Sequence, residues 1–109
     1  MENEMKTVGK LSDNQIKELK EKHGDIFAIK VKDSEGAEHY AYLRKPKRRD
    51  LSAASVAGTK DPLKFNEVIM RQCWAGGDDA IRNDDYLFLA ASGVMADIIE
   101  VGEAELEKL

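Results

Sequence analysis

Residues 61–99 read DPLKFNEVIMRQCWAGGDDAIRNDDYLFLAASGVMADII, and this stretch decides the fold because it holds most of the large apolar side chains. Asp61-Pro62 is a typical helix start, since aspartate caps free backbone amides and proline fits the first helical position. The Gly76-Gly77 pair ends the first apolar run, and a second begins after Asn83 or Asp84. The stretch therefore predicts two helices joined by a turn of glycines and aspartates.

The first of these helices, residues 62–74, carries two apolar stripes when its residues are placed at about 100° intervals. The wide stripe consists of Phe65, Val68, Ile69 and Cys73, and the narrow one of Leu63, Met70 and Trp74. One stripe can enter the core, whereas the other needs a further element or a partner. The narrow stripe is therefore either core packing or a partner-binding anchor, because aromatic and methionine side chains are enriched in interfaces.

The second helix, running to about residue 99, is apolar almost all round. Its apolar residues are Leu87, Phe88, Leu89, Ala90, Ala91, Val94, Met95, Ile98 and Ile99. Such a helix is expected at the centre of its domain or buried in an interface. Gly102 interrupts the pattern, and the acidic residues 103–109 predict a short helical turn.

The residues before this stretch predict one helix and a β-hairpin. Ser12 and Gln15 have the spacing of a capping box, which predicts a helix that ends at Gly24. Residues 26–32 and 38–44 follow the period of a strand, with a glycine-containing loop between them. A two-stranded ribbon alone is marginal in water, so one face must lie on helices or an edge must pair with another chain.

Three further segments complete the expected organisation. Residues 51–57 are mostly alanine and serine and predict a short helix, capped by Asp50 and stopped by Gly58. Residues 1–10 are polar and aperiodic and predict a disordered tail. The expected fold class is α+β, as a single domain over residues 11–109, with an N-terminal helix, a β-hairpin, three packed helices and a short C-terminal helical turn.

The composition of the 109 residues, 42% apolar and 35% charged, predicts a folded and highly soluble protein. Residues 1–60 hold 13 Lys/Arg against 10 Asp/Glu, a net charge of +3, whereas residues 61–109 hold 4 against 11, a net charge of −7. This polarity can orient the protein against a partner or a second copy. With one cysteine, no secretion signal and no apolar run near the roughly 20 residues of a membrane span, we expect a cytoplasmic protein without an internal disulfide or a membrane segment.

A basic run is the most prominent charge feature of the sequence. Its five cations are Arg44, Lys45, Lys47, Arg48 and Arg49. The simplest interpretation is a solvated connector between a strand and a helix. Contact with phosphates of a nucleic acid and docking onto an acidic partner are the two alternatives.

The sequence predicts no catalytic residues, no metal site and no cofactor. Cys73 lies on the wide apolar stripe without a nucleophile signature, which favours a small core side chain. The four aspartates at 78, 79, 84 and 85 fail the order of a calcium loop and suit turn and cap positions. Gly76-Gly77 lacks the following Lys-Ser/Thr of a phosphate-binding loop.

Two passages resemble the tail assembly chaperones of phages and prophages. AYLRKPKRRDLSAAS (41–55) is similar to the family's strand ending in an Arg-x-Pro-like motif before an Ala/Ser-rich helix. DPLKFNEVIMRQCWAGGDDAIRNDDYLFLAA (61–91) is similar to its helical region, with the Cys-Trp pair, the Gly-Asp pair and a turn with paired acids. The resemblance covers residues 38–99 and rests on loose patterns.

The resemblance implies a non-enzymatic chaperone, encoded by a phage or prophage, that coats the tape-measure protein and recruits tail-tube subunits. Apolar helix surfaces, with Leu63, Met70 and Trp74 as anchors, would bind the partner. The basic residues Arg44, Lys45, Arg48 and Arg49 would steer docking, and copies of the protein could self-associate. The alternative function is a small nucleic-acid-binding regulator that uses residues 44–49, although we expect nucleic acid less than a protein partner.

Overall fold

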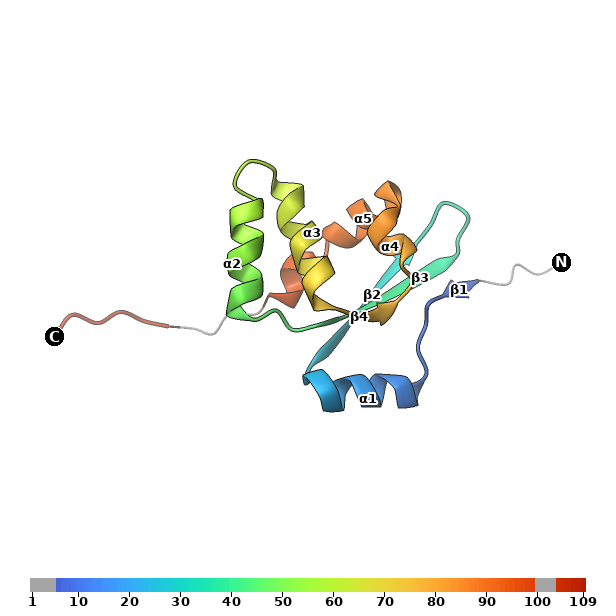
Figure 1. Ribbon diagram of the computed structural model, residues 1–109, viewed down its shortest axis with the longest axis horizontal. Helices are drawn as coiled ribbons and strands as arrows, with labels where there is room; N and C mark the ends of the chain where they lie inside the picture. The colour runs from blue at the N-terminus through green and yellow to red at the C-terminus, as the bar shows by residue number, and fades with distance from the viewer. Residues whose placement is uncertain (1–5, 100–103) are drawn as a thin grey trace.

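A computed structural model describes residues 6–99 and 104–109 of the chain and confirms the α+β class. A four-stranded sheet lies between two layers of helix (Figure 1). Helix α1 (Asp13–His23) covers one face of the sheet. The helices that follow the hairpin, from α2 (Arg48–Ala57) to α5 (Asp85–Ser92), lie on the other side.

Strand β3 (Glu38–Arg44) is the centre of the sheet. The predicted hairpin is confirmed, since β2 (Ile26–Lys32) pairs antiparallel with β3 over seven residues in regular register. On its other side β3 has two partners, β1 (Thr7–Val8), which is parallel, and β4 (Trp74–Gly77), which is antiparallel. These additional strands give the ribbon the width that a stable sheet needs.

The N-terminal segment differs from the expected disordered tail. Thr7 and Val8 pair with Glu38 and His39, and the Glu38 backbone N–H donates to the Lys6 carbonyl at 2.7 Å. The prediction was therefore wrong for these residues, because their partner strand lies 31 positions further along the chain and leaves no local pattern. The rest of the expected tail, residues 1–5, lies outside the described residues.

Helix α1 forms as predicted. The Gln15 backbone N–H donates to the Ser12 hydroxyl at 3.2 Å, and the Ser12 N–H donates to the Gln15 side chain at 2.8 Å, which completes the capping box. Gly24 ends the helix with a φ of 84°. The helix has no fully buried residue, and the Leu11 N–H before it donates to the Tyr42 hydroxyl on the covered face of the sheet at 3.2 Å.

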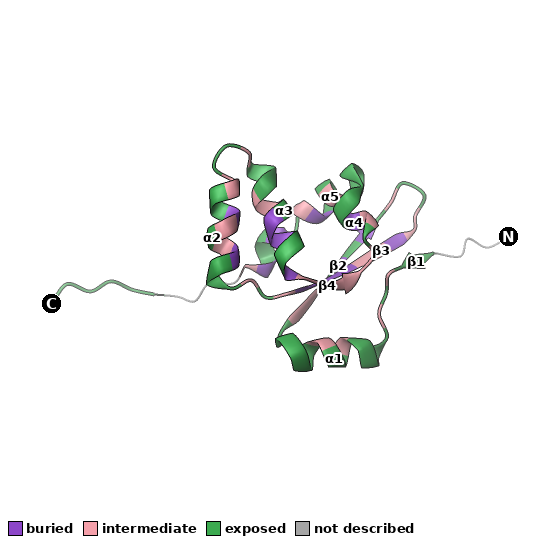
Figure 2. Cartoon of the chain, viewed as in Figure 1, coloured by how far each residue is buried: buried purple, intermediate pink, exposed green. Residues whose placement is uncertain are grey.

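The hydrophobic core lies between the sheet and the helices after the hairpin (Figure 2). Alternate residues of β2 and β3 face the core. Each of the helices α2, α3 (Pro62–Cys73), α4 (Ala80–Asn83) and α5, and the 3₁₀ helix η1 (Met95–Ile98), turns one side toward it. Its buried members are Ile29, Val31, Ala41, Leu43, Ala54, Val68, Ile69, Met70, Cys73, Ile81, Leu87, Ala91, Met95 and Ile98.

Two predicted helix boundaries are wrong by a few residues, with consequences for the site. Helix α2 begins at Arg48 instead of Leu51, because Asp50 sits inside the first turn and accepts the Lys47 N–H at 2.8 Å instead of standing before the helix. Helix α3 starts after the Asp61 cap as predicted but ends at Cys73. Trp74 therefore belongs to strand β4, which takes the edge of β3 that β1 leaves open.

The predicted last helix is divided into α5 and η1, and the predicted turn before it contains the short helix α4. Asp84 caps α5 as expected by accepting the Leu87 N–H at 3.0 Å, but α5 ends at Ser92, and Gly93 separates it from η1. Glycine in a helix interior is unfavourable, which explains the break. A helical turn was expected over residues 103–109, but residues 104–109 form neither helix nor strand, so this prediction was wrong for them. Residue 103 lies outside the described residues.

Gly77 allows strand β4 to approach β3, and we expect Gly77→Ala to destabilise the fold by about 3 kcal/mol or more. Its φ is 118°, and an added Cβ would lie 2.4 Å from the Tyr40 carbonyl oxygen. Gly36→Ala is the matched control, because Gly36 has a similar φ of 88° with open space around it and should cost only about 1 kcal/mol. Urea unfolding measures both, and equal costs would contradict the close approach.

Candidate protein-binding surface

Helix α5 presents an apolar stripe to solvent. Tyr86, Leu89 and Ala90, which we call the α5 stripe, lie three and four residues apart and therefore share one face. Tyr86 is 58% exposed and Leu89 is 52% exposed. The opposite face, with Leu87 and Ala91, is buried in the core. Because this helix is apolar all round, burying one face leaves the other in water.

A cleft of about 440 Å³ lies beside this helix, between α3 and the α4–α5 segment. Met70 and Phe88 supply its apolar surface. Charged side chains of both signs surround them, from Glu67 and Arg71 on α3 and from Arg82 and Asp85 on the other wall. The cleft therefore combines a small apolar area with charged side chains.

The predicted anchors Leu63, Met70 and Trp74 do not share one face. Met70 is 1% exposed and belongs to the core, although it borders the cleft. Trp74 is half-buried in β4, and the Arg82 guanidinium lies 4.1 Å from the centre of its ring, a cation–π contact. Leu63 is exposed in the first turn of α3. Trp74 is separated from the group because it lies outside the helix, and Leu63 and Met70 are separated by their different burial.

The basic run is divided by the fold. Arg44 donates to both carboxylate oxygens of Asp50, at 2.8 and 3.3 Å, and to the Gln72 carbonyl at 2.9 Å. Its guanidinium hydrogen bonds hold the pKa of the buried Asp50 carboxyl below its usual range. Arg44 therefore ties the end of β3 to α2 and α3. It is a structural residue and not a free contact for a partner.

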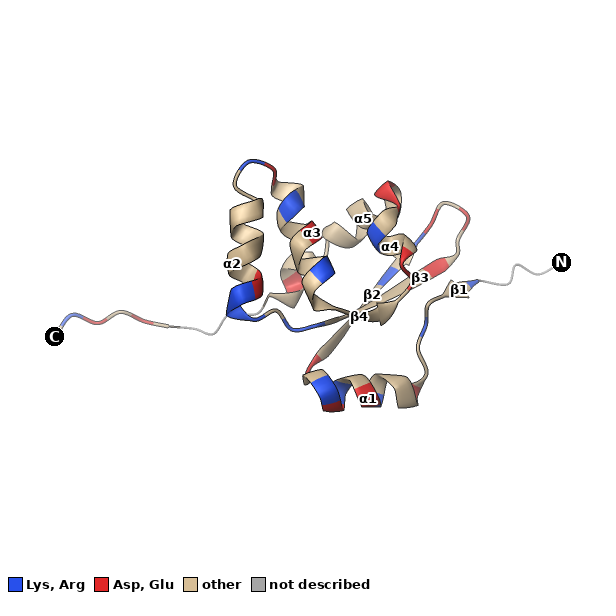
Figure 3. Cartoon of the chain, viewed as in Figure 1, with Lys and Arg blue, Asp and Glu red and all other residues tan. Residues whose placement is uncertain are grey.

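The other basic residues lie along the connector and the first turn of α2 (Figure 3). Arg48 and Arg49 are exposed there, at the positive end of the helix dipole, where cations are unfavourable. Lys45 and Lys47 precede them on the connector. The structure thus separates Arg44 from the predicted docking set and leaves Arg48 and Arg49 accessible at a helix start.

Cys73 is confirmed as a core side chain. It is fully buried, and its Sγ lies 3.8 Å from an Asp50 carboxylate oxygen. Burial raises the pKa of the Cys73 thiol to about 11. A thiol that stays protonated at neutral pH is a poor nucleophile.

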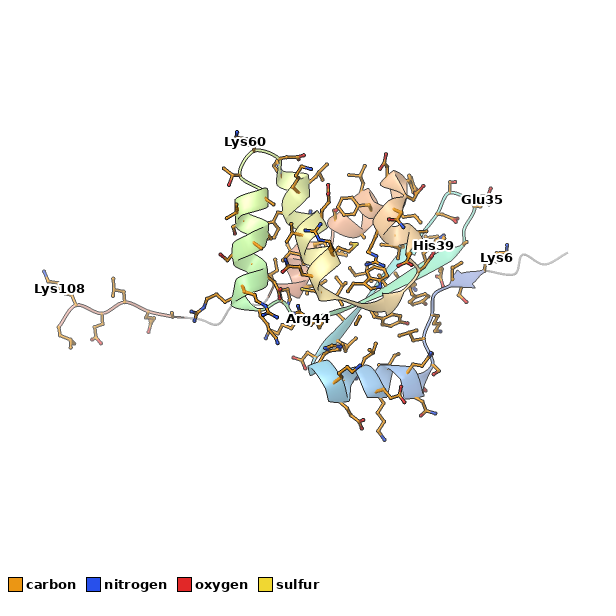
Figure 4. All side chains as sticks on the ribbon, in the orientation of Figure 1. Lys6, Glu35, His39, Arg44, Lys60 and Lys108 are labelled. Carbon is orange, nitrogen blue, oxygen red and sulfur yellow. The ribbon has the colours of Figure 1, made fainter. Side chains whose placement is uncertain are left out.

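His39 forms a contact that the sequence did not reveal. Its Nδ1 lies 2.7 Å from an Asp78 carboxylate oxygen and its Nε2 lies 2.9 Å from one of Asp33. Both ring nitrogens must carry a proton to donate both bonds, so this geometry requires the imidazolium form. We call these three residues the His39 clasp. His39 and Arg44 mark opposite ends of β3 (Figure 4).

The charges of the clasp stabilise one another. The hydrogen bonds to Asp78 and Asp33 raise the pKa of His39 above its ordinary value of 6.5. The bond to His39 likewise lowers the pKa of Asp33. Burial opposes ionisation of Asp78, yet its bonds with His39 and the Ala80 amide lower its pKa overall. No sequence pattern joins these residues, because Asp33 and Asp78 are 6 and 39 positions from His39.

Of the four aspartates in the 78–85 segment, Asp78 and Asp84 have the expected turn and cap functions. Asp84 caps α5, Asp79 pairs with Arg82, and Asp78 accepts the Ala80 N–H at 3.1 Å. Within residues 6–99 and 104–109, no group of His, Cys, Asp and Glu side chains could hold a metal ion. None of the helices in these ranges combines the length and apolarity that crossing a membrane requires.

No protein-family model matches the sequence, and no curated protein or solved structure is significantly similar to it. The geometry of the chain itself therefore carries the functional inference. The described residues offer the apolar α5 stripe with the mixed cleft beside it, and they form ionic contacts at both ends of β3.

Arg44→Ala is expected to destabilise the protein by about 3–5 kcal/mol, because it leaves the Asp50 charge buried without its partner. Arg48→Ala removes a charge from the same basic run at an exposed position, and it should change stability by no more than about 0.5 kcal/mol. Chemical unfolding of both variants measures the difference. A similar small effect for both would show that Arg44 belongs to an exposed basic patch after all.

The His39 clasp predicts a pH dependence of stability. Because folding raises the pKa of His39, its contribution is fully present below about pH 6.5 and is lost as the pH rises through the folded-state pKa. The lowered pKa values of Asp33 and Asp78 add stability that is lost as the pH falls below 3.8. The free energy of unfolding, measured between about pH 5 and pH 9, should decline at the alkaline end.

His39→Gln is expected to flatten that decline, since an amide does not titrate in this range. His23→Gln is the control, because His23 is exposed at the end of α1. An unchanged slope in the His39 variant would rule out the clasp as its source.

Proposed function

We propose that this protein is a non-enzymatic assembly chaperone of a phage or prophage tail, which acts in the host cytoplasm by binding other proteins. The observation that supports this proposal is the α5 stripe. A helix that exposes Tyr86 and Leu89 beside a cleft of mixed polarity has surface for a partner to cover. The resemblance of residues 38–99 to tail assembly chaperones supplies the biological setting.

The partner we propose is an apolar helical segment of the tape-measure protein, with tail-tube subunits as a second partner. A helix laid along α5 would bury the stripe, and a side chain from it could enter the cleft next to Phe88. Asp84 and Asp85 are exposed at the start of α5, and they favour a segment with basic residues beside its apolar face.

Two side chains that could support catalysis, those of Cys73 and His39, are not available for it. The Cys73 thiol is buried with a pKa near 11, and both nitrogens of His39 are bound to carboxylates. The nucleic-acid alternative is weakened because Arg44 is bound to Asp50 in an ion pair and is not available to contact phosphates. These observations favour a protein that binds over one that makes or breaks bonds.

We expect Leu89→Asp to weaken binding to a tape-measure fragment about thirtyfold or more, since it places a charge in the centre of the proposed contact. The fragment comes from the tape-measure protein expected to be encoded beside this gene, and its affinity is measured by biolayer interferometry. Val56→Asp is the matched control, because Val56 is 75% exposed on α2 and should tolerate the same change without loss of binding.

Equal affinity of the wild type and Leu89→Asp for the fragment would remove α5 from the proposal. Substitution of Met70 would not be a suitable test, because Met70 is buried in the core and its loss would affect folding. A gel shift with DNA and RNA at low salt tests the rival function. A shift that disappears as salt is added would favour the rival.

A further inference from the structure

The outer edge of strand β2 has unpaired backbone groups, and the ladder shows which residues carry them. The Glu38 N–H donates toward β1, at 2.7 Å, and the Tyr40 carbonyl accepts from Asp78 after β4, at 2.8 Å. Even-numbered residues of β3 therefore direct their backbone groups away from β2. Because these directions alternate along a strand, the odd-numbered residues of β3 face β2.

The register then identifies the free groups on β2 itself. Ile29 lies opposite Ala41, and Val31 lies opposite His39, so these odd-numbered residues of β2 bond with β3. Ala28, Lys30 and Lys32 direct their N–H and C=O groups outward. Among the described residues, β3 is the only strand that pairs with β2.

This edge lacks a bulge and a proline, two of the features that prevent strand addition, and the charges of Lys30 and Lys32 are its remaining protection. The ladder between β2 and β3 is regular over seven residues, with no bulge and no proline in β2. The two faces of β2 differ in chemistry. Ile29 and Val31 face the core, whereas Lys30 and Lys32 are exposed on the opposite side. An added strand should therefore have apolar residues on one face and acidic residues on the other.

In the segment of residues 104–109, which reads AELEKL, the first four residues have this pattern. Glu105 and Glu107 alternate with Ala104 and Leu106. The segment forms neither helix nor strand, and it runs away from the body of the protein at the end opposite β1 (Figure 1). Leu106 and Leu109 are fully exposed. In an extended strand Leu106 shares a face with Ala104, whereas Leu109 shares a face with Glu105 and Glu107.

We propose that residues 104–109 of one copy of the chain pair with the free edge of β2 in a second copy. An antiparallel arrangement can place Glu105 opposite Lys32 and Glu107 opposite Lys30, because the two glutamates have the same two-residue spacing as the two lysines. Leu106 then lies opposite Val31, on the core side of the sheet. Lys108 comes opposite Ile29, and Leu109 comes opposite Ala28 on the face of Lys30 and Lys32, next to a hollow bordered by Ile26 and Phe27.

Reciprocal exchange of the two segments gives a closed dimer with two-fold symmetry. Each copy then receives one strand and gives one, so both free edges are covered. The second contact forms within the complex, which raises its effective concentration. This dimer is independent of the proposed function, since β2 and the α5 stripe are different surfaces.

Substitutions that reverse the charge of the segment or of the β2 edge test the proposal. Glu105→Lys/Glu107→Lys reverses the segment at exposed positions, so the fold is expected to persist. It should weaken dimerisation about tenfold or more in sedimentation equilibrium of the full chain. Lys30→Glu/Lys32→Glu should weaken it similarly. A mixture of the two variants should form a heterodimer, because each edge then meets a segment of opposite charge.

Thermal unfolding of each variant checks the fold, since Lys30 also contacts Glu38 at 3.5 Å. Hydrogen exchange gives a second measurement, in which the amides of Ala28, Lys30 and Lys32 gain protection in the wild type as its concentration rises. A wild type that stays monomeric at all concentrations would overturn the proposal. So would protection that is independent of concentration, because the segment would then pair within its own chain.

Discussion

The ion pair of Arg44 and Asp50 is the interaction on which the helical half of the fold depends. Asp50 is buried at the start of α2, and an uncompensated carboxylate there would be strongly unfavourable. Arg44 supplies two bonds to it, the Lys47 amide supplies a third, and Arg44 also reaches the Gln72 carbonyl at the end of α3. One guanidinium thus sets the position of two helices relative to the sheet, and α5 packs against the core that they form.

The His39 clasp has the corresponding function at the other end of β3. It links β3 to the hairpin loop through Asp33 and to the turn before α4 through Asp78. The central strand is therefore held by charge at both ends and by apolar packing between them. Because the turn at Asp78 leads into α4 and then α5, the clasp also positions the helix that exposes the α5 stripe.

The features that the sequence predicted are those with local causes. The capping box of α1, the hairpin and the Asp61-Pro62 start of α3 each depend on residues within a few positions of one another. Thr7–Val8, the strand at Trp74 and the partners of His39 depend on β3, which is distant in sequence, so no local pattern contains them. The candidate surface was predicted only in part. The all-round apolar character of the last helix indicated either the centre of the domain or an interface, whereas the grouping of Leu63, Met70 and Trp74 assumed a helix one residue too long.

The central position of β3 also constrains the order in which the chain can fold during synthesis. β1 leaves the ribosome first, but its partner follows about thirty residues later, and β4 completes the same side of β3 only after residue 77 has been made. The nascent hairpin thus has its apolar face open until most of the protein has been translated. Pairings between distant segments slow folding. Slow translation between residues 44 and 77 would therefore lengthen the period in which that face is open to aggregation.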